Sequence, residues 1–301
     1  MVEPVFTGYL APPEHIEDML AELGDGAEVH GRLALAPGPA RPIAWVANVW
    51  HDPQRIAIAS IAEGARALRA IQRNWALYAA GLHRRASLIG ERLPHVSAKP
   101  LKSPAALPSA PLGSWTLLDA NTILAAARCS SAFPNGEIQF VEDREGPPNR
   151  AYLKLWEALT IAGRRPGPGS LCLDLGSSPG GWSWALQKLG ARVISVDKAP
   201  LEPSIAALPG IDFRRVSAFS LDAAAIGPID WLFSDVICYP ARLLRLVETW
   251  LAGGTVRNFV CTLKFQGPTD METTRRFAAI PASRLVHLSH NKHELTWIKL
   301  E

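Results

Sequence analysis

The hydrophobic pattern is clearest in the second half of the chain, where short apolar runs alternate with longer segments of helical periodicity. The first run, 171–175, is apolar except for one acid, as in strands buried on both faces of a parallel sheet. Trp182, Leu186 and Leu189 then recur at helical spacing, and a second apolar run covers 192–196. Strands that alternate with helices in this way predict an α/β fold with a parallel sheet.

The turn between the first strand and its helix reads G-S-S-P-G-G-W. Its glycines, Gly176, Gly180 and Gly181, permit a tight turn and a close backbone approach to a ligand, because no Cβ stands in the way. The turn lacks the Gly-Lys-Ser/Thr of a phosphate-binding P-loop, and Ser178 interrupts a dinucleotide-type G-x-G-x-x-G. The second strand closes on Asp197, whose carboxylate could accept hydrogen bonds from ribose hydroxyls, as an acid also does in NAD sites. The pattern favours a cofactor loop over an ordinary strand-to-helix connection.

This segment, D-L-G-S-S-P-G-G-W-S followed by V-I-S-V-D, resembles the cofactor loop of the FtsJ-like RNA ribose 2′-O-methyltransferases. The similarity runs from about Asn149 to Glu301, and its blocks are most similar to the RlmM type, which modifies large-subunit ribosomal RNA. The resemblance implies a Rossmann-like methyltransferase domain that binds S-adenosylmethionine. The cofactor-binding residues that it implies are Gly176, Ser178, Pro179, Gly180, Gly181, Trp182, Asp197, Ser217 and Asp235.

The resemblance also implies a Lys-Asp-Lys-Glu catalytic set, formed here by Lys154, Asp235, Lys264 and Glu294. A ribose 2′-hydroxyl is a poor nucleophile, so methyl transfer to it needs a base or cations that stabilise the developing alkoxide. We expect Lys264 to take or share the hydroxyl proton, Asp235 and Glu294 to hold Lys264, and Lys154 to orient the hydroxyl and its phosphate. The alternative is that Lys154 and Glu294 form surface ion pairs, which contribute little.

Two positions depart from the family pattern. Ser217 stands where many members have an acid that receives the adenine amino group, so the Ser217 hydroxyl or the backbone around Ala218 and Phe219 would have to substitute. After Asp235 the sequence is V-I-C-Y-P rather than the A-P-N of the wider family, which supports the RlmM type. It also matches neither the Pro-Pro-aromatic motif of amino methylation nor the Pro-Cys of carbon-5 pyrimidine methylation. We interpret Cys238 as a packing residue.

Residues 1–111 predict a smaller α+β domain and linker, and 112–301 the methyltransferase domain. The N-terminal pattern gives a β-α-β-β-α order, with a long helix over about 60–81, which begins a ferredoxin-like sandwich. By resemblance this domain corresponds to the RNA-binding THUMP region. The proline-rich stretch 99–114 is predicted to be a linker or strap.

Local charge favours an acidic partner for this domain, although the net charge of +3 is too mild to decide. Arginines recur at helical spacing, with Trp75 and Tyr78 just beyond as stacking surfaces for bases. The alternative places Trp75 and Tyr78 in the core of the domain. The predicted RNA-binding residues are Arg66, Arg69, Arg73, Arg84 and Arg85.

The rest of the composition is that of an intracellular enzyme. Four scattered cysteines without a C-x-x-C pair indicate neither a disulfide framework nor a zinc site. No apolar run reaches membrane-spanning length and the first residues lack a signal peptide, so we expect a cytosolic protein. The cluster His287, His290 and His293 is expected to be a solvated loop and no metal is expected, while the oligomeric state stays open.

Together with these features, the resemblance implies S-adenosylmethionine-dependent methyl transfer to a ribose 2′-hydroxyl of RNA, with ribosomal RNA as the partner. One alternative is a methyltransferase of tRNA or a small hydroxyl compound. A second is a catalytically idle RNA-binding or assembly protein that kept the fold. The presence of both Lys154 and Lys264 disfavours the idle protein.

Overall fold

The computed structural model describes residues 5–301 and divides the chain into two compact units. The first unit contains residues 5–101 and 107–139, and the second contains Lys102–Ala106 and Phe140–Glu301. The expectation of no signal peptide rests partly on residues 1–4, which lie outside the described residues. Over residues 5–301, no helix has both the length and the apolar content to cross a bilayer.

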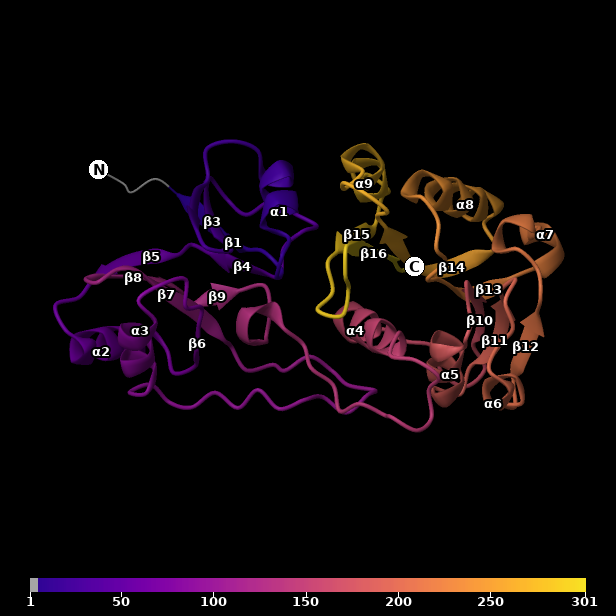
Figure 1. Cartoon of the computed structure of the whole chain (residues 1–301), viewed down its shortest axis with the longest axis horizontal. Helices are drawn as coiled ribbons and strands as arrows, with labels where there is room; N and C mark the ends of the chain where they lie inside the picture. Colours follow the sequence, from indigo (N-terminus) through magenta and orange to yellow (C-terminus); the bar gives the residue numbers. More distant parts are fainter. Residues whose placement is uncertain (1–4) are drawn as a thin grey trace. The chain divides into compact units, whose positions relative to one another are not determined.

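The first unit is rich in short strands that form two sheets (Figure 1). One sheet has the order β2-β3-β1-β4-β9 and the other the order β5-β8-β7-β6. The strands are β1 (Phe6–Leu10), β2 (Glu28–His30), β3 (Leu33–Pro37), β4 (Asn48–His51), β5 (Gln54–Ala57), β6 (Trp75–Leu77), β7 (Gly113–Asp119), β8 (Thr122–Ala126) and β9 (Arg128–Cys129). The helices are α1 (Ile16–Leu23), α2 (Ile61–Ile71) and α3 (His83–Gly90), with the short 3-10 helix η1 at Pro134–Gly136.

The start of this unit follows the expected order only in part. The segment predicted as one strand after α1 is the hairpin of β2 and β3, and both β4 and β5 come before the second helix. That helix, α2, packs into the core of the second sheet through Ala65 and Leu68, together with Ile89 of α3. The helices of the unit are therefore divided between two sheets.

The domain boundary predicted near Leu112 is wrong. Strands β7 and β8 pair with each other, and they also pair with β6 and β5, so 113–126 completes the second sheet of the first unit. The stretch 102–106, from the middle of the predicted linker, belongs instead to the second unit. Edge strands that find partners across a proline-rich stretch cannot be recognised from local composition.

The helix predicted over 60–81 is too long. Ser60 caps α2 by accepting from the N–H of Glu63, and the helix ends at Ile71 because Gln72 is extended. Trp75 then lies in β6 and is buried, and its Nε1 donates to the Leu68 carbonyl at 2.9 Å. Tyr78 is buried as well, so the core placement of both aromatic rings holds and their predicted stacking role is wrong.

The second unit is a single seven-stranded sheet of order β12-β11-β10-β13-β14-β16-β15 with helices on both faces (Figure 1). All adjacent strands are parallel except for β16, which is antiparallel to β14 and to β15. The strands are β10 (Leu171–Leu175), β11 (Arg192–Val196), β12 (Ile211–Arg214), β13 (Ile229–Ser234), β14 (Val256–Lys264), β15 (Ser283–Val286) and β16 (Glu294–Lys299). The helices are α4 (Tyr152–Ala162), α5 (Gly181–Lys188), α6 (Pro203–Ala206), α7 (Ala223–Ile226), α8 (Pro240–Gly253) and α9 (Met271–Ala278), with the 3-10 helix η2 at Ala218–Ser220.

This strand order fixes where a ligand can bind. From β10 the chain builds outward through β11 and β12, then returns to add β13 and β14 on the other side of β10. Loops that leave β10 and β13 in opposite directions open a crevice at the carboxyl ends of the strands, which is where open α/β sheets bind ligands. The Rossmann-like α/β architecture predicted from the sequence is confirmed.

Candidate active site

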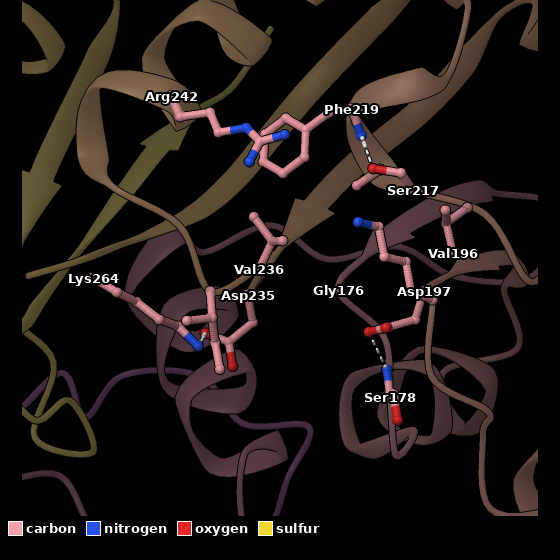
Figure 2. Close-up of a pocket in the computed structure, with 13 residues that line it drawn as sticks. Gly176, Ser178, Val196, Asp197, Ser217, Phe219, Asp235, Val236, Arg242 and Lys264 are labelled. Atoms are coloured by element: carbon pink, nitrogen blue, oxygen red, sulfur yellow. Dashed lines mark hydrogen bonds and ion pairs between the residues drawn. The ribbon is translucent and has the colours of Figure 1, made fainter. Parts of the chain in front are cut away.

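A cavity of about 450 Å³ lies at the carboxyl ends of β10, β11, β13 and β14 (Figure 2). Its volume falls within the range of roughly 300–1,000 Å³ that is typical of small-ligand sites. The predicted cofactor residues that line it are Gly176, Ser178, Asp197, Ser217 and Asp235, and the predicted catalytic Lys264 lines it too. Figure 2 shows Asp197 and Ser178 on one side of this cavity and Lys264 with Asp235 on the other.

The glycine-rich turn shapes the cavity through its backbone. Gly176 has a φ of +79°, and a Cβ on it would stand 2.6 Å from the Cα of Val236, so only glycine fits between the loops that follow β10 and β13. Gly180 has a φ of +122°, and a Cβ there would meet the Ile205 side chain at 2.7 Å. The turn therefore needs glycine at both positions. Gly176 packs against the Val236 backbone beside the cavity, and Gly180 packs against Ile205 of α6.

The remaining predicted residues of the turn support it rather than line the cavity. Gly181 opens α5, and a Cβ on it would stand 2.2 Å from Oδ1 of Asn149. Trp182 is buried, and its Nε1 donates to the Ala151 carbonyl at 2.8 Å. The described part of the chain does not place Pro179 among the lining residues.

Asp197 holds the loop and faces the cavity at the same time. Its Oδ2 accepts from the Ser178 N–H at 3.0 Å, and its Oδ1 accepts from the Ala199 N–H at 2.9 Å. Each carboxylate oxygen has a second acceptor site. Asp197 can therefore bind a pair of ligand hydroxyls without releasing the loop.

Asp174, the acid of the strand before the turn, is buried and serves the fold. The Ser183 hydroxyl donates to it at 2.6 Å and also lies 2.6 Å from the Ser195 hydroxyl, which ties β10 to α5 and β11. Burial raises the pKa of Asp174 to about 7, and the hydrogen bond from Ser183 opposes this rise only in part. Asp174 thus fixes the strand from which the glycine turn departs.

The far wall of the cavity contains a pair that the sequence reasoning missed. Cζ of Arg242, on α8, lies 3.8 Å from the centre of the Phe219 ring, and both side chains line the cavity (Figure 2). Ser217 caps η2 by accepting from the Phe219 N–H at 3.3 Å, which leaves its own hydroxyl hydrogen for a ligand. Lys198, next to Asp197, is a further lining residue that was not predicted. No motif marks these residues, because helix α8 and η2 meet only in the folded sheet.

The predicted catalytic residues come together at the other end of the cavity. Nζ of Lys154 lies 2.8 Å from Oδ1 of Asp235 and 3.0 Å from Oε1 of Glu294. Nζ of Lys264 lies 3.1 Å from the same Oδ1 of Asp235. The four side chains are between 10% and 19% exposed, so these are not the solvated surface pairs of the alternative interpretation.

One detail of the predicted cluster is wrong: Glu294 pairs with Lys154 rather than holding Lys264. Lys264 and Glu294 are opposite each other in the register of β14 and β16, but the Glu294 carboxylate forms its ion pair with the buried ammonium of Lys154 on α4. Within residues 5–301, Asp235 is the acid that bridges the two lysines. Lys264 is also the lysine of the pair that lines the cavity, so it is better placed than Lys154 to meet a ligand.

Lys154 is held in its charged form. Burial alone would lower the pKa of Lys154, but the charges of Asp235 and Glu294 and their hydrogen bonds outweigh burial and raise it. A buried ammonium between two carboxylates is a fixed positive charge rather than a base. Lys154 is therefore a poor candidate for a proton acceptor.

The segment that follows Asp235 exposes apolar side chains, of which Ile237 lines the cavity. Ile237 is 78% exposed and Tyr239 is 67% exposed, and Cys238 between them is buried. Burial raises the pKa of the Cys238 thiol, as expected for a residue that packs rather than reacts.

The predicted RNA-binding arginines all lie in the first unit. Arg66 and Arg69 are exposed on α2, but Arg73 follows the helix and does not share its face. Arg84 is exposed and Arg85 is half-buried on α3. They remain a prediction.

Comparison with known proteins bears on the second unit. Residues 147–255 match the family described as FtsJ-like methyltransferase. Over these residues the second unit is similar to the FtsJ-like methyltransferases. The matched residues contain the glycine turn, Lys154 and Asp235, whereas Lys264 and Glu294 lie beyond them.

Relatives of the chain bear names of ribosomal RNA methyltransferases. "Ribosomal RNA large subunit methyltransferase M" of Halorhodospira halophila is 35% identical over 159 residues, which cover 50% of this chain and 46% of the relative. The protein of the same name from Methylococcus capsulatus is 32% identical over 164 residues, with the same coverage of 50% and 46%. The chain thus spans about half the length of the curated relatives it matches. A fibrillarin pre-rRNA processing protein of Methanococcus jannaschii is structurally similar at a TM-score of 0.40 and 16% identity, over 61% of this chain and 80% of that chain.

Proposed function

We propose that this protein transfers a methyl group from S-adenosylmethionine to a ribose 2′-hydroxyl of RNA, and that large-subunit ribosomal RNA is the substrate. The observation that carries the proposal is the Lys264–Asp235–Lys154–Glu294 cluster at one end of a ligand-sized cavity. Its chemistry is that of hydroxyl activation. The names of the relatives support the choice of RNA.

The residues of the cavity fit S-adenosylmethionine. Asp197 offers carboxylate oxygens to ribose hydroxyls, and Ser217 with Phe219 offers a polar group beside an aromatic ring for the base. Gly176 lines the cavity and lets the loop after β10 lie against the Val236 backbone, next to Asp235. When bound, the cofactor supplies an electrophilic methyl group.

Within this site the chain's own residues activate the acceptor. Lys264 is placed to take the proton of the 2′-hydroxyl as that oxygen becomes the nucleophile. Asp235 holds the resulting ammonium by a contact of 3.1 Å. Lys154, charged and held by Glu294, keeps Asp235 in place and contributes positive potential near the developing alkoxide.

The surroundings of the cavity suit an RNA acceptor. The cavity is also lined by Lys198 and Arg242, whose positive charges favour an acceptor that carries phosphates. Ile237, which lines the cavity, and Tyr239, two residues further along the chain, are exposed and offer apolar surface on which an unstacked base can lie. A ribosomal RNA substrate would also require the cytosolic location expected from the sequence.

The rival functions fit the cluster less well. Burying a lysine costs desolvation free energy unless its charge is compensated. Here two carboxylates compensate the charge of Lys154, and Lys264 lies beside it. An idle RNA-binding protein gains nothing from that arrangement. A tRNA or a small hydroxyl compound would use the same chemistry, so only the acceptor assay separates these substrates.

In that assay the protein is incubated with radiolabelled S-adenosylmethionine and, separately, with large-subunit RNA, small-subunit RNA or tRNA from a strain that lacks the gene. We expect label in the large-subunit RNA alone. Label in tRNA alone would replace the proposed substrate, and transfer to none of the RNAs would refute the proposed function.

Replacing Asp197 by alanine should weaken S-adenosylmethionine binding. The change removes the acceptor for the ribose hydroxyls and releases the Ser178 N–H from its 3.0 Å contact. A lost hydrogen bond to a charged group costs about 1.5–3 kcal/mol, so Kd should rise by roughly 10- to 100-fold. Calorimetry measures it, with Asp212→Ala, an exposed acid paired with Arg214, as the control. Equal affinities in the two variants would remove Asp197 from the cofactor site.

Reversing the charges of Arg66, Arg69 and Arg73 should weaken RNA binding without changing cofactor affinity. If these side chains contact phosphates, each lost contact should lower the slope of log Kd against log salt by about one unit. Fluorescence anisotropy with a large-subunit RNA fragment measures both. Arg128→Glu, an exposed arginine paired with Asp52 in the same unit, is the control. An unchanged salt slope in the triple variant would show that this surface does not bind RNA.

A further inference from the structure

A second buried carboxylate lies on the helix that carries Lys154. Glu157 follows Lys154 by three residues on α4 and is 1% exposed. Its Oε1 accepts from the Ser289 N–H at 2.7 Å, and its Oε2 accepts from the His290 N–H at 3.2 Å. The imidazole of His290 adds a third contact, with Nδ1 at 2.7 Å from Oε2. One side chain thus fixes two successive residues of a loop.

This loop leads directly into the strand that begins with Glu294. Asn291 donates from Nδ2 to the Glu294 carbonyl at 3.0 Å and to the Thr296 hydroxyl at 3.3 Å, so the residues between the Glu157 contacts and β16 are themselves held. The Glu294 carboxylate then meets Lys154 at 3.0 Å. Helix α4 therefore holds the same short segment at two points, through Glu157 and through Lys154.

We propose that Glu157, together with His290, is a positioning residue for methyl transfer: it fixes the loop that delivers Glu294 to Lys154. The inference rests on the proposed function, since Lys154 matters to catalysis only there. With the loop released, Glu294 loses its fixed distance to Lys154, and Lys154 then holds Asp235 less firmly. Neither Glu157 nor His290 lines the cavity in the described part of the chain, so the effect passes through Glu294.

The test is a double-mutant cycle between Glu157 and Glu294. Glu157→Gln keeps the shape of the side chain but turns an amide NH₂ toward one of its donors. Single-turnover transfer should slow by roughly 10-fold through misplacement of the cluster, with the affinities for cofactor and RNA unchanged. In the Glu294→Gln background the same change should have little further effect, because coupled residues are not additive. Additive losses would show that Glu157 only stabilises the fold and would overturn the proposal.

Two further variants guard against a general loss of stability. Glu22→Gln is the matched control, since Glu22 likewise accepts from the backbone N–H groups of Ala44 and Trp45, but in the first unit. Any effect of Glu22→Gln on the single-turnover rate should be the same with and without Glu294→Gln. His290→Ala removes only the side-chain contact with Glu157, so it should fold even if Glu157→Gln does not. The single-turnover rate of His290→Ala should fall less than that of Glu157→Gln, and the fall should likewise be non-additive with Glu294→Gln. Additive losses for His290→Ala would overturn the proposal.

Hydrogen exchange separates this proposal from the proposed function. In Glu157→Gln the amides of Ser289 and His290 should exchange faster, while the amides of β10 and β13 keep their rates. Unchanged exchange at Ser289 and His290 would overturn the proposal even in an active enzyme. If the wild type methylates no RNA, the proposed function fails and the catalytic role of Glu157 fails with it, whereas faster loop exchange would still support the structural clamp.

Discussion

Replacing Lys264 by alanine is expected to slow single-turnover methyl transfer by at least ~100-fold, the usual contribution of a positioned acid–base group. Lys264 is the member of the lysine pair that lines the cavity, and Asp235 holds its Nζ at 3.1 Å. Alanine leaves no group to accept the proton of the acceptor hydroxyl. The affinities for S-adenosylmethionine and RNA should change little, since the glycine turn and Asp197 are untouched.

Lys264→Arg separates proton transfer from charge stabilisation. A guanidinium keeps the positive charge but does not give up its proton near neutral pH, so the arginine variant should remain as slow as the alanine variant. Recovery of the rate by arginine would mean that Lys264 stabilises charge and that the proton goes elsewhere. Near-wild-type transfer by Lys264→Ala at saturating RNA and cofactor would refute the assignment of Lys264 altogether.

Asp235→Asn is expected to lower the transfer rate by a similar factor, at least ~100-fold, because Asp235 is the bridge between both lysines. The neutral amide no longer compensates the charge of the buried Lys154, so burial should pull the pKa of Lys154 down against the single carboxylate of Glu294. Single-turnover rates measured across pH report both effects. Glu294→Gln should cost less, since Lys154 keeps Asp235.

The double variant Asp235→Asn with Lys264→Ala tests whether the bridge acts through Lys264. Residues that act as a unit are far from additive, so the double variant should be about as slow as Lys264→Ala alone. Asp212→Asn, an exposed acid outside the cavity, is the control and should keep the wild-type rate. If Asp235→Asn retained most of the activity, the bridge seen between the lysines would have no catalytic role.

Much of the second unit could be predicted because its sequence signals are local. The apolar run of β10, the glycines at Gly176 and Gly180, and the acid at Asp197 lie within one strand–turn–helix–strand unit. The motif resemblance selects the four predicted catalytic residues, and the structure brings their side chains into contact. The motif does not specify which charged groups pair with each other. Glu294 is predicted to hold Lys264, but in the structure it pairs with Lys154.

The features that were missed depend on contacts between distant parts of the chain. His290 was expected in a solvated loop, but its partner Glu157 lies 133 residues away. Arg242 meets Phe219 only because α8 and η2 pack beside the same cavity. In the first unit, β5 and β6 pair with β8 and β7, which follow the proline-rich stretch in the sequence, so the domain extends beyond the predicted boundary. Because Trp75–Leu77 forms β6, helix α2 is also shorter than predicted. No periodicity within one segment reports such pairings.

The central claim, that the acceptor is a ribose 2′-hydroxyl, is tested most directly by identifying the methylated nucleoside. Large-subunit RNA from a strain that lacks the gene is incubated with the protein and radiolabelled S-adenosylmethionine, then digested to nucleosides and separated against standards. We expect label in a 2′-O-methylated nucleoside with the wild-type protein, and none with Lys264→Ala. Label on a base, in any nucleoside, would contradict it.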